Sequence, residues 1–164
     1  MLFLVLLVNT GYVAAFSSPT IFYMTNVLGH VVLGTGLAVL MLLVARRGAL
    51  KGASLATGLL TLGFVLGALL TYEGNVRDNA WILWAHIGAA IAGVAALVPF
   101  VWKKASLWGG GWTTFKKSFA GSLAVLVLLP VVGHGYKRFL PDPNNRIVNP
   151  ATPPLSMDGE GGGP

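Results

Sequence analysis

Histidine is the residue type in this sequence with the widest chemistry, and it occurs at three positions, His30, His86 and His134. A neutral imidazole binds metal ions and haem iron, and it exchanges a proton near neutral pH. All three histidines fall within long stretches that contain no Asp, Glu, Lys or Arg. Ionisable groups inside a bilayer are costly and usually functional. The histidines are therefore the first candidate site residues.

Small side chains surround each histidine. Asn26, His30 and Gly34 recur at intervals of four residues, which places them on one face of a helix. A haem is flat and wide, so helices that clasp one need small residues beside the ligands. The spacing makes Asn26 and Gly34 candidate cofactor-binding residues. The other small neighbours of the histidines are Gly29, Gly36, Gly88, Ala89, Ala90, Gly93, Gly133 and Gly135.

His30 and His86 form the best-matched pair, because the predicted spans place them at similar depths on different helices. Two neutral imidazoles that face each other suit the iron of a six-coordinate b-type haem. His134 could replace one of them or hydrogen-bond a haem propionate. Cations at the same level could neutralise the propionates, and these are Arg77, Lys137 and Arg138.

Other interpretations of the histidines stay open. A histidine inside a membrane often only hydrogen-bonds between helices. Proton or quinone chemistry is a further possibility for His30 and His86. A single histidine could also bind the magnesium of a chlorophyll or bacteriochlorophyll. For His134 an interfacial position without a cofactor is the favoured interpretation.

The elements that must position these residues follow from composition. The chain has 164 residues, which predicts one domain, and 10% of them are charged, against about 25% in soluble domains. The first 45 residues hold no Asp, Glu, Lys or Arg. Such a chain is an integral membrane protein, which excludes most classes of soluble enzyme. The absence of cysteine excludes disulfides, zinc–thiolate sites, iron–sulfur clusters and covalent c-type haem within this chain.

The charge-free stretches predict an all-α transmembrane bundle over residues 1–136. Spanning a bilayer takes about 20 apolar residues in a helix. Four spans meet this length, and a fifth at the N-terminus is short. Residues 137–164 hold six of the nine prolines and predict an extended, extracytoplasmic tail or linker. The predicted spans are 1–16, 20–45, 52–72, 79–102 and 115–136.

Three local features add expectations about packing and helix ends. The GxxxG pattern from Gly63 to Gly67 predicts a close-packing face for another helix of this chain or of a partner. The segment Trp108–Trp112 is interpreted as a flexible interfacial turn. Pro130 is expected to kink or end the last helix.

The cations predict the orientation of the chain. Seven of the eleven lie in two loops on one side, which should be cytoplasmic. The N-terminus is then cytoplasmic, the C-terminus extracytoplasmic, and all three histidines lie in the outer half of the membrane. The net charge of +6 is thus mainly a topology signal, and nucleic-acid binding is not expected. The seven cations are Arg46, Arg47, Lys51, Lys103, Lys104, Lys116 and Lys117.

Both ends of the sequence resemble a known family. The run NTGYVAAFSSPTIFY at 9–23, followed by NVLGH at 26–30, resembles the N-terminal membrane domain of bacterial multihaem c-type cytochromes, some of which carry tetratricopeptide repeats. The run PPLSMDGEGGGP at 153–164 resembles the linker that leads to their first haem-binding motifs. A looser analogy is the membrane-anchored reaction-centre cytochrome subunit. This chain departs from the family in having no Cys-x-x-Cys-His motif.

The resemblance implies electron transport in a bacterial inner (cytoplasmic) membrane, with an extracytoplasmic c-type cytochrome or a larger redox or photosynthetic complex as partner. It implies no ligand assignment within the spans. We therefore expect an electron carrier or anchor subunit rather than a stand-alone enzyme. The alternative is a structural anchor or assembly subunit of a photosynthetic or respiratory complex, without a redox cofactor. In a photosynthetic complex this alternative includes contact with chlorophyll.

Overall fold

The computed structural model describes residues 1–18, 20–48, 50–108 and 110–140. Within these residues the chain forms five α-helices and one short 3-10 helix, and it contains no strand. The tail predicted at 137–164 lies outside the described residues from position 141 onward. The elements are α1 (Leu2–Ala15), α2 (Ile21–Arg46), α3 (Ser54–Glu73), η1 (Arg77–Asn79), α4 (Ala80–Trp108) and α5 (Gly110–Phe139).

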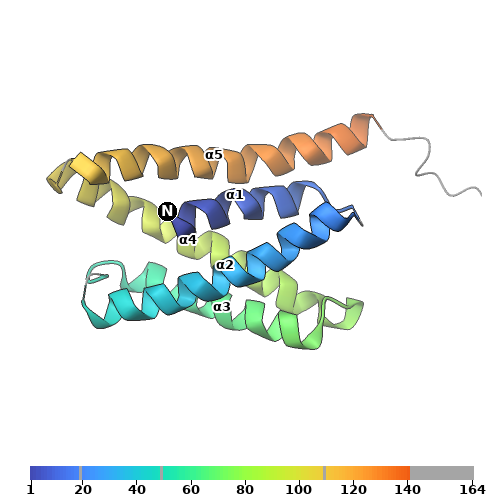
Figure 1. Cartoon of the computed structure of the whole chain (residues 1–164), viewed down its shortest axis with the longest axis horizontal. Helices are drawn as coiled ribbons and strands as arrows, with labels where there is room; N and C mark the ends of the chain where they lie inside the picture. The colour runs from blue at the N-terminus through green and yellow to red at the C-terminus, as the bar shows by residue number, and fades with distance from the viewer. Residues whose placement is uncertain (19, 49, 109, 141–164) are drawn as a thin grey trace, which may run out of the picture.

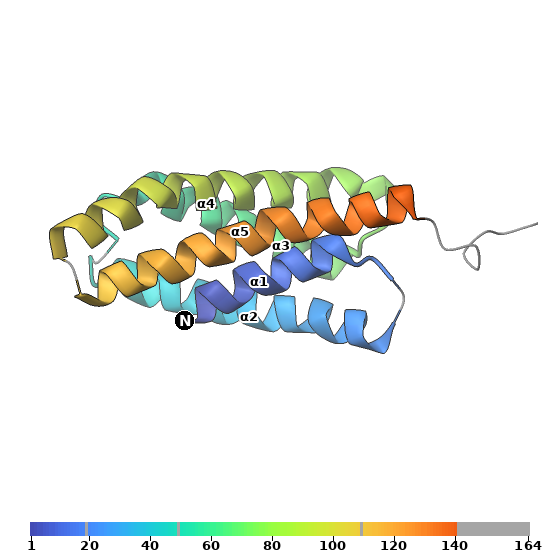
Figure 2. The same ribbon diagram turned by 90° about the horizontal axis from the view of Figure 1, so that it is seen from above.

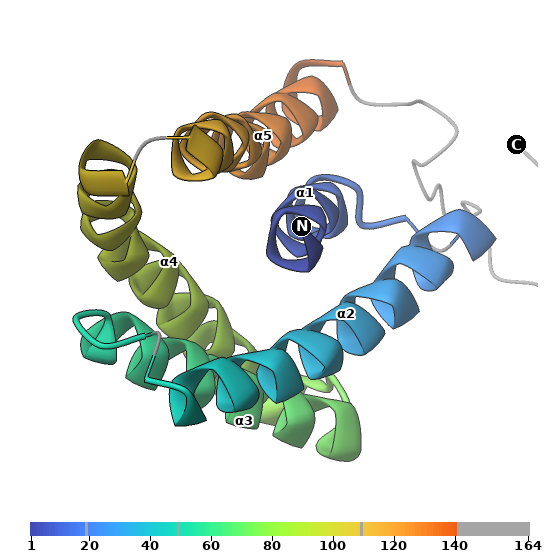
Figure 3. The ribbon, with the colours of Figure 1, turned by 60° about the vertical axis from the view of Figure 1, so that its left-hand side comes forward.

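The helices form an elongated bundle in which neighbours along the chain run antiparallel (Figures 1 and 2). Four helices, α2 to α5, are long and apolar enough to cross a membrane, whereas α1 has only 14 residues. The short α1 lies on the concave side of an arc formed by α2 to α5, which is open between α2 and α5, and it begins part-way along the bundle (Figures 2 and 3). The predicted all-α membrane bundle with a short fifth helix is confirmed, and the protein is a multi-pass membrane protein.

The seven cations of the two predicted loops lie at one end of the bundle, which we call the cationic end. There α2 ends and α3 begins, and α4 ends and α5 begins (Figure 1). The ends of α1, α3 and α5 and the starts of α2 and α4 lie at the opposite end (Figure 1). His30 and His86 lie in the halves of α2 and α4 nearer this opposite end.

The turn predicted at Trp108–Trp112 is shorter than expected, because the described residues of this segment belong to the ends of two helices. Helix α4 runs six residues past the predicted end at 102, and α5 begins at Gly110, five residues before its predicted start. Aromatic contacts explain the extension. The Trp112 ring lies edge-on to Phe100 and to Phe115, with centroids 6.4 and 5.9 Å apart, and these contacts hold the two helix ends together.

Pro130 does not end α5, which continues nine residues further to Phe139. Pro99 lies inside α4 in the same way. A proline inside a helix removes one backbone N–H donor. Ending the helix within the lipid would leave several backbone N–H and C=O groups without partners, at a cost of several kcal/mol each. Continuing the helix is therefore less costly in a membrane than ending it.

Helices α3 and α4 form the closest pair in the bundle, as the GxxxG pattern predicted. Gly63 faces Ala90 of α4, and Gly67 faces His86. Gly93 of α4 lies so close to Leu60 that a Cβ atom at position 93 would stand 2.8 Å from the Leu60 Cγ. The partner of the GxxxG face is therefore another helix of this chain.

Helix α1 packs mainly against α5 through small residues. A Cβ on Gly11 would come within 3.1 Å of the Val125 carbonyl oxygen, and one on Gly133 within 3.0 Å of the Ala15 carbonyl oxygen. Gly133 therefore serves the α1–α5 contact and not the surroundings of His134. The buried side chains next to this contact centre on Phe119, which is fully buried and stacks on Phe115 with centroids 6.0 Å apart.

Helix α2 contrasts with the others because none of its residues is buried. Its start is fixed by Thr20, whose side chain accepts a hydrogen bond from the Tyr23 backbone N–H at 3.2 Å. Large apolar side chains such as Leu28 and Val32 are mostly exposed on it. In a bilayer this surface faces lipid or a partner helix.

Candidate functional site

The structure brings His30 of α2 and His86 of α4 together. Their ring centroids lie 6.3 Å apart, and the ring planes are nearly perpendicular at 83°. Both side chains are half-buried. These two residues are separated by 56 positions in the sequence, and depth within the predicted spans was the only signal that paired them.

The ring of His86 is held against α3. Its Nδ1 lies 2.8 Å from the backbone carbonyl oxygen of Gly63, which can only accept a hydrogen bond. The proton of the neutral ring is therefore on Nδ1, and Nε2 carries the free lone pair. Gly67 lies below the ring, where a Cβ atom would stand 3.0 Å from the His86 Cε1. Both glycines of the GxxxG pattern thus position this histidine.

The ring of His30 is held by α1 through Thr10. The His30 Nδ1 lies 3.3 Å from the Thr10 hydroxyl oxygen. That hydroxyl donates its own proton to the Leu6 backbone carbonyl at 2.7 Å, so toward the imidazole it can only accept. Nδ1 of His30 therefore donates, and Nε2 carries the free lone pair, as in His86.

In both histidines Nδ1 is bonded to an outer acceptor and Nε2 keeps its lone pair, which is the hydrogen-bonding state of metal-ligating histidines in proteins. Two imidazoles on opposite sides of one metal ion, each about 2 Å from it, have ring centroids about 6 Å apart. The measured separation of 6.3 Å matches this value.

The number of ligands narrows the choice of metal site. In the described part of the chain, no group of three or more His, Cys, Asp or Glu side chains is placed to hold a metal ion. A tetrahedral zinc site needs more protein ligands than this pair supplies. A haem brings four nitrogens of its own and needs only two axial ligands, so the donor set fits a b-type haem.

Three glycines near the histidines in the sequence have open space around them. A Cβ atom added to Gly29, Gly34 or Gly88 would meet nothing within 4 Å. These glycines are not used to pack the helices of this chain against one another, unlike Gly93. The surface of α2 and α4 is therefore unobstructed at these positions, and only Gly34, four residues after His30, shares the face of a histidine.

His134 does not join the pair. It is exposed on α5, and its Nδ1 lies 3.0 Å from the carbonyl oxygen of Pro130, four residues earlier on the same helix. Asn26 is also engaged, because the Asn9 Nδ2 donates to its backbone and side-chain oxygens at 3.2 and 3.0 Å. Asn26 thus links α1 to α2.

The cations predicted for the propionates lie in exposed positions. Arg77 lies in η1, and Lys137 and Arg138 lie in the last turn of α5, at the same end of the bundle. The Lys137 ammonium donates to the Ser17 hydroxyl at 3.4 Å. All three therefore stay available to anionic groups at this end, but no described contact joins them to the histidines.

The sequence analysis missed the residues that orient the rings, Thr10 and Gly63. Thr10 carried a usable signal, because Asn9 and Thr10 are adjacent polar residues in an otherwise apolar helix. The Gly63 carbonyl gave no signal in the sequence. Every residue has a backbone carbonyl, and only the packing of α3 against α4 places this one beside His86.

No family model, curated protein or solved structure matches this chain. The site is therefore interpreted from its own geometry.

Proposed function

We propose that this protein is the membrane subunit of an electron-transfer system, with a b-type haem bound between His30 and His86. The observation that carries the proposal is the meeting of two imidazoles whose Nδ1 atoms are both committed to acceptors on neighbouring helices. A bound haem would supply reversible one-electron chemistry at its iron.

The residues of the chain have separate tasks in this proposal. His30 and His86 would hold the haem through Nε2, while Thr10 and the Gly63 carbonyl hold the rings in the tautomer that leaves Nε2 free. The surrounding apolar helices limit water at the site. At 1.5 Å per residue, His30 lies about 14 Å and His86 about 9 Å from the starts of their helices. Electron exchange would therefore take place near the end of the bundle opposite the cationic end.

We place the cationic end in the cytoplasm of a bacterial cell and the histidines toward the outer face of the inner membrane. The partner in this proposal is an extracytoplasmic c-type cytochrome, or a larger redox or photosynthetic complex, next to the tail. Support comes from the family resemblance of the two sequence ends and from the position of the Phe139 end of α5 near the histidine half of the bundle.

An absorbance spectrum of the purified protein tests the proposal. We expect a reduced-minus-oxidised α band of b-type haem that is lost in His30→Ala and in His86→Ala. His134→Ala is the matched control and should keep the band, because His134 bonds only within α5. A colourless wild-type protein, or variants that keep the band, would contradict haem binding at this pair.

A structural anchor without a redox cofactor is the second candidate function. It is favoured by the fact that the bonds of His30 to Thr10 and of His86 to Gly63 each join two helices. On this interpretation the protein is colourless, and both alanine variants unfold at lower temperature than the wild type. A far-red absorbance band would instead indicate a chlorophyll or bacteriochlorophyll.

A further inference from the structure

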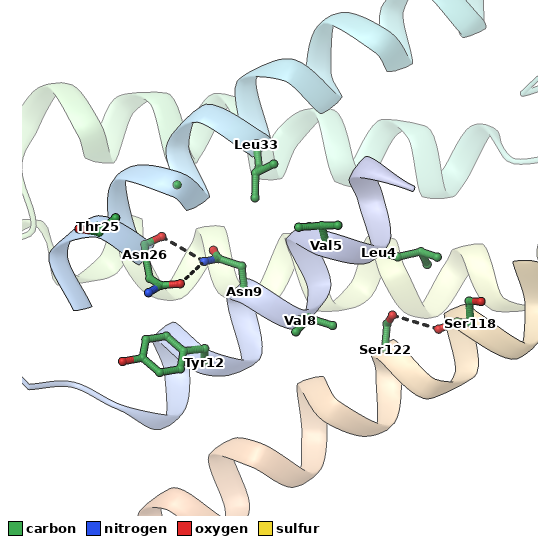
Figure 4. A pocket seen from close by; sticks show the side chains of 11 residues that line it. Leu4, Val5, Val8, Asn9, Tyr12, Thr25, Asn26, Leu33, Ser118 and Ser122 are labelled. Carbon is green, nitrogen blue, oxygen red and sulfur yellow. Dashed lines mark hydrogen bonds between the residues drawn. The ribbon is translucent and has the colours of Figure 1, made fainter. Parts of the chain in front are cut away.

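Two surfaces of the bundle are candidates for binding a further molecule. The groove between α1, α2 and α5 carries polar side chains at both of its ends, with Asn9 and Asn26 at one and Ser118 and Ser122 at the other (Figure 4). This pattern selects no single occupant. The cationic end is more selective, because charges of one sign favour one class of partner. Its two loops, α2–α3 and α4–α5, lie apart from each other (Figure 3).

The α4–α5 side of the cationic end carries four lysines at one level, which we call the lysine cluster: Lys103, Lys104, Lys116 and Lys117. Lys103 lies five residues before the end of α4, and Lys116 lies six residues after the start of α5. At the rise of an α-helix both are about 8–9 Å from these helix ends. Residues 105–115, which form the tip of the hairpin beyond the cluster, contain no charged side chain.

An aromatic ring holds one of these lysines in place. The Lys116 ammonium lies 5.7 Å from the centroid of the Trp102 ring, which is within cation–π range. Trp102 packs in turn against Phe119 with centroids 6.3 Å apart, and Phe119 is fully buried. An ammonium has three N–H donors, so one that contacts a ring can still donate to an anionic oxygen. The packing of α4 against α5 therefore orders a donor before any ligand arrives.

Acidic side chains lie far from the lysine cluster. The two in the described residues, Glu73 and Asp78, are at the opposite end of the bundle, in the last turn of α3 and in η1. The charges of the cluster are therefore suited to an anionic ligand from outside the bundle.

The level of the lysines indicates the class of anion. The charge-free stretch of α4 ends at Trp102, and the part of α4 beyond Lys104 is about 6 Å long at the rise of an α-helix. The headgroup layer on each side of a bilayer is about 5–8 Å thick. The uncharged tip therefore fits within this layer, and the lysines lie at the level of the lipid phosphates.

We propose that the lysine cluster and Trp102 form a binding site for an anionic phospholipid, with Lys116 donating to a phosphate oxygen. A zwitterionic headgroup carries a cation of its own, which the lysines would repel, so the site should prefer a lipid with net negative charge. The site goes beyond the proposed haem and does not depend on it, because His30 and His86 lie in the other half of the bundle.

Native mass spectrometry of the protein in detergent micelles, titrated with phosphatidylglycerol or phosphatidylcholine, tests the proposal. For the first lipid bound, we expect the wild type to prefer phosphatidylglycerol at least fivefold. One lysine near an anionic surface contributes about a fivefold factor to binding. The double variant Lys116→Gln/Lys117→Gln should therefore bind phosphatidylglycerol at least fivefold more weakly than the wild type.

Arg46→Gln/Arg47→Gln is the matched control, because it removes the same charge from the α2–α3 loop, where residues 42–53 include no aromatic side chain. It should bind phosphatidylglycerol within twofold of the wild type. Lys116→Arg/Lys117→Arg keeps both charges and should do the same. Circular dichroism checks the helix content of each variant.

A soluble anion provides the last comparison. Glycerol phosphate carries the same phosphate group without acyl chains, so an excess of it should not displace phosphatidylglycerol. Displacement would show that the cluster binds soluble phosphate compounds instead. That result, equal binding of the two lipids, or equal losses in the two glutamine variants would overturn the proposal.

Discussion

The hydroxyl of Thr10 takes part in two hydrogen bonds, and its role as donor in one makes it the acceptor in the other. Because its proton goes to the Leu6 carbonyl, its oxygen is left to accept from His30. Outer partners of this kind typically change metal affinity 10–100-fold when they are removed. Thr10→Val keeps the shape of the side chain and should weaken haem retention by that factor, measured by haem transfer to an apo-globin acceptor.

Thr35→Val is the matched control for this prediction. Thr35 makes the same type of bond to a carbonyl four residues earlier, on Val31, but it is exposed and contacts neither histidine. We expect its haem retention to equal that of the wild type. An equal loss in both variants would mean that Thr10 acts only on helix stability.

Single residues also show what the sequence could predict of the site. Depth in the spans was enough to pair His30 with His86, because the depth of a residue follows from the span boundaries. The same reasoning placed His134 near the same membrane face but could not show that it bonds within α5. Ring orientation depends on which backbone atoms a neighbouring helix presents, and no sequence pattern reports this.

At the level of helix pairs, the α3–α4 contact offers a direct test of packing. A Cβ on Gly93 would stand 2.8 Å from the Leu60 Cγ and 3.1 Å from the Leu60 backbone nitrogen. Overpacking of this kind typically costs about 1–3 kcal/mol. Gly93→Ala should therefore lower the free energy of unfolding by this amount, measured by denaturation in detergent micelles.

Gly88 lies on the same helix and supplies the comparison. Its Cβ position meets nothing within 4 Å, so Gly88→Ala adds no clash. Alanine has a helix propensity about 1 kcal/mol better than glycine. We expect Gly88→Ala to be neutral or stabilising by up to that amount. Equal destabilisation in both variants would show that the loss does not come from the Leu60 contact, and an unchanged stability of Gly93→Ala would show that Leu60 moves aside.

The predicted helix ends were less accurate than the predicted helices. The boundary near Thr20 was predicted, because the run of small polar residues and Pro19 interrupts the apolar sequence. The extension of α4 to Trp108 was not predicted, and Pro130 was expected to kink or end a span that was nevertheless drawn to residue 136, because the usual helix breakers were weighed as they act in water. In lipid, leaving a backbone group without a hydrogen-bond partner costs more free energy than keeping a proline or a glycine inside the helix.

For the molecule as a whole, the charge distribution fixes two ends that an orientation experiment can distinguish. The sequence has no cysteine, so one introduced thiol reports one position. Asn75→Cys lies between α3 and η1, and Ser106→Cys lies near the cationic end of α4. In intact bacterial cells, a membrane-impermeant maleimide should label position 75 and should label position 106 only after permeabilisation. The reverse pattern would invert the proposed topology.

The class of the molecule could be predicted because it depends on composition. Stretches such as Met1–Ala45, without acidic or basic side chains, leave no alternative to a lipid-embedded helix bundle. The arrangement of the helices could not be predicted. The packing of α1 against α5 depends on close contacts at Gly11 and Gly133, and nothing in the sequence distinguishes these two glycines from the others.

The bonds of the two histidines also imply an order of assembly. His30 is bonded to α1 and His86 to α3, which are the helices that precede their own in the chain. Each helical hairpin, α1–α2 and α3–α4, therefore orients its own imidazole as soon as that hairpin has formed. Since chains are synthesised from the N-terminus, the first ligand is ready before the second exists. The pair is complete only when the two hairpins associate, so the haem proposed above would be loaded only at that late stage of biogenesis.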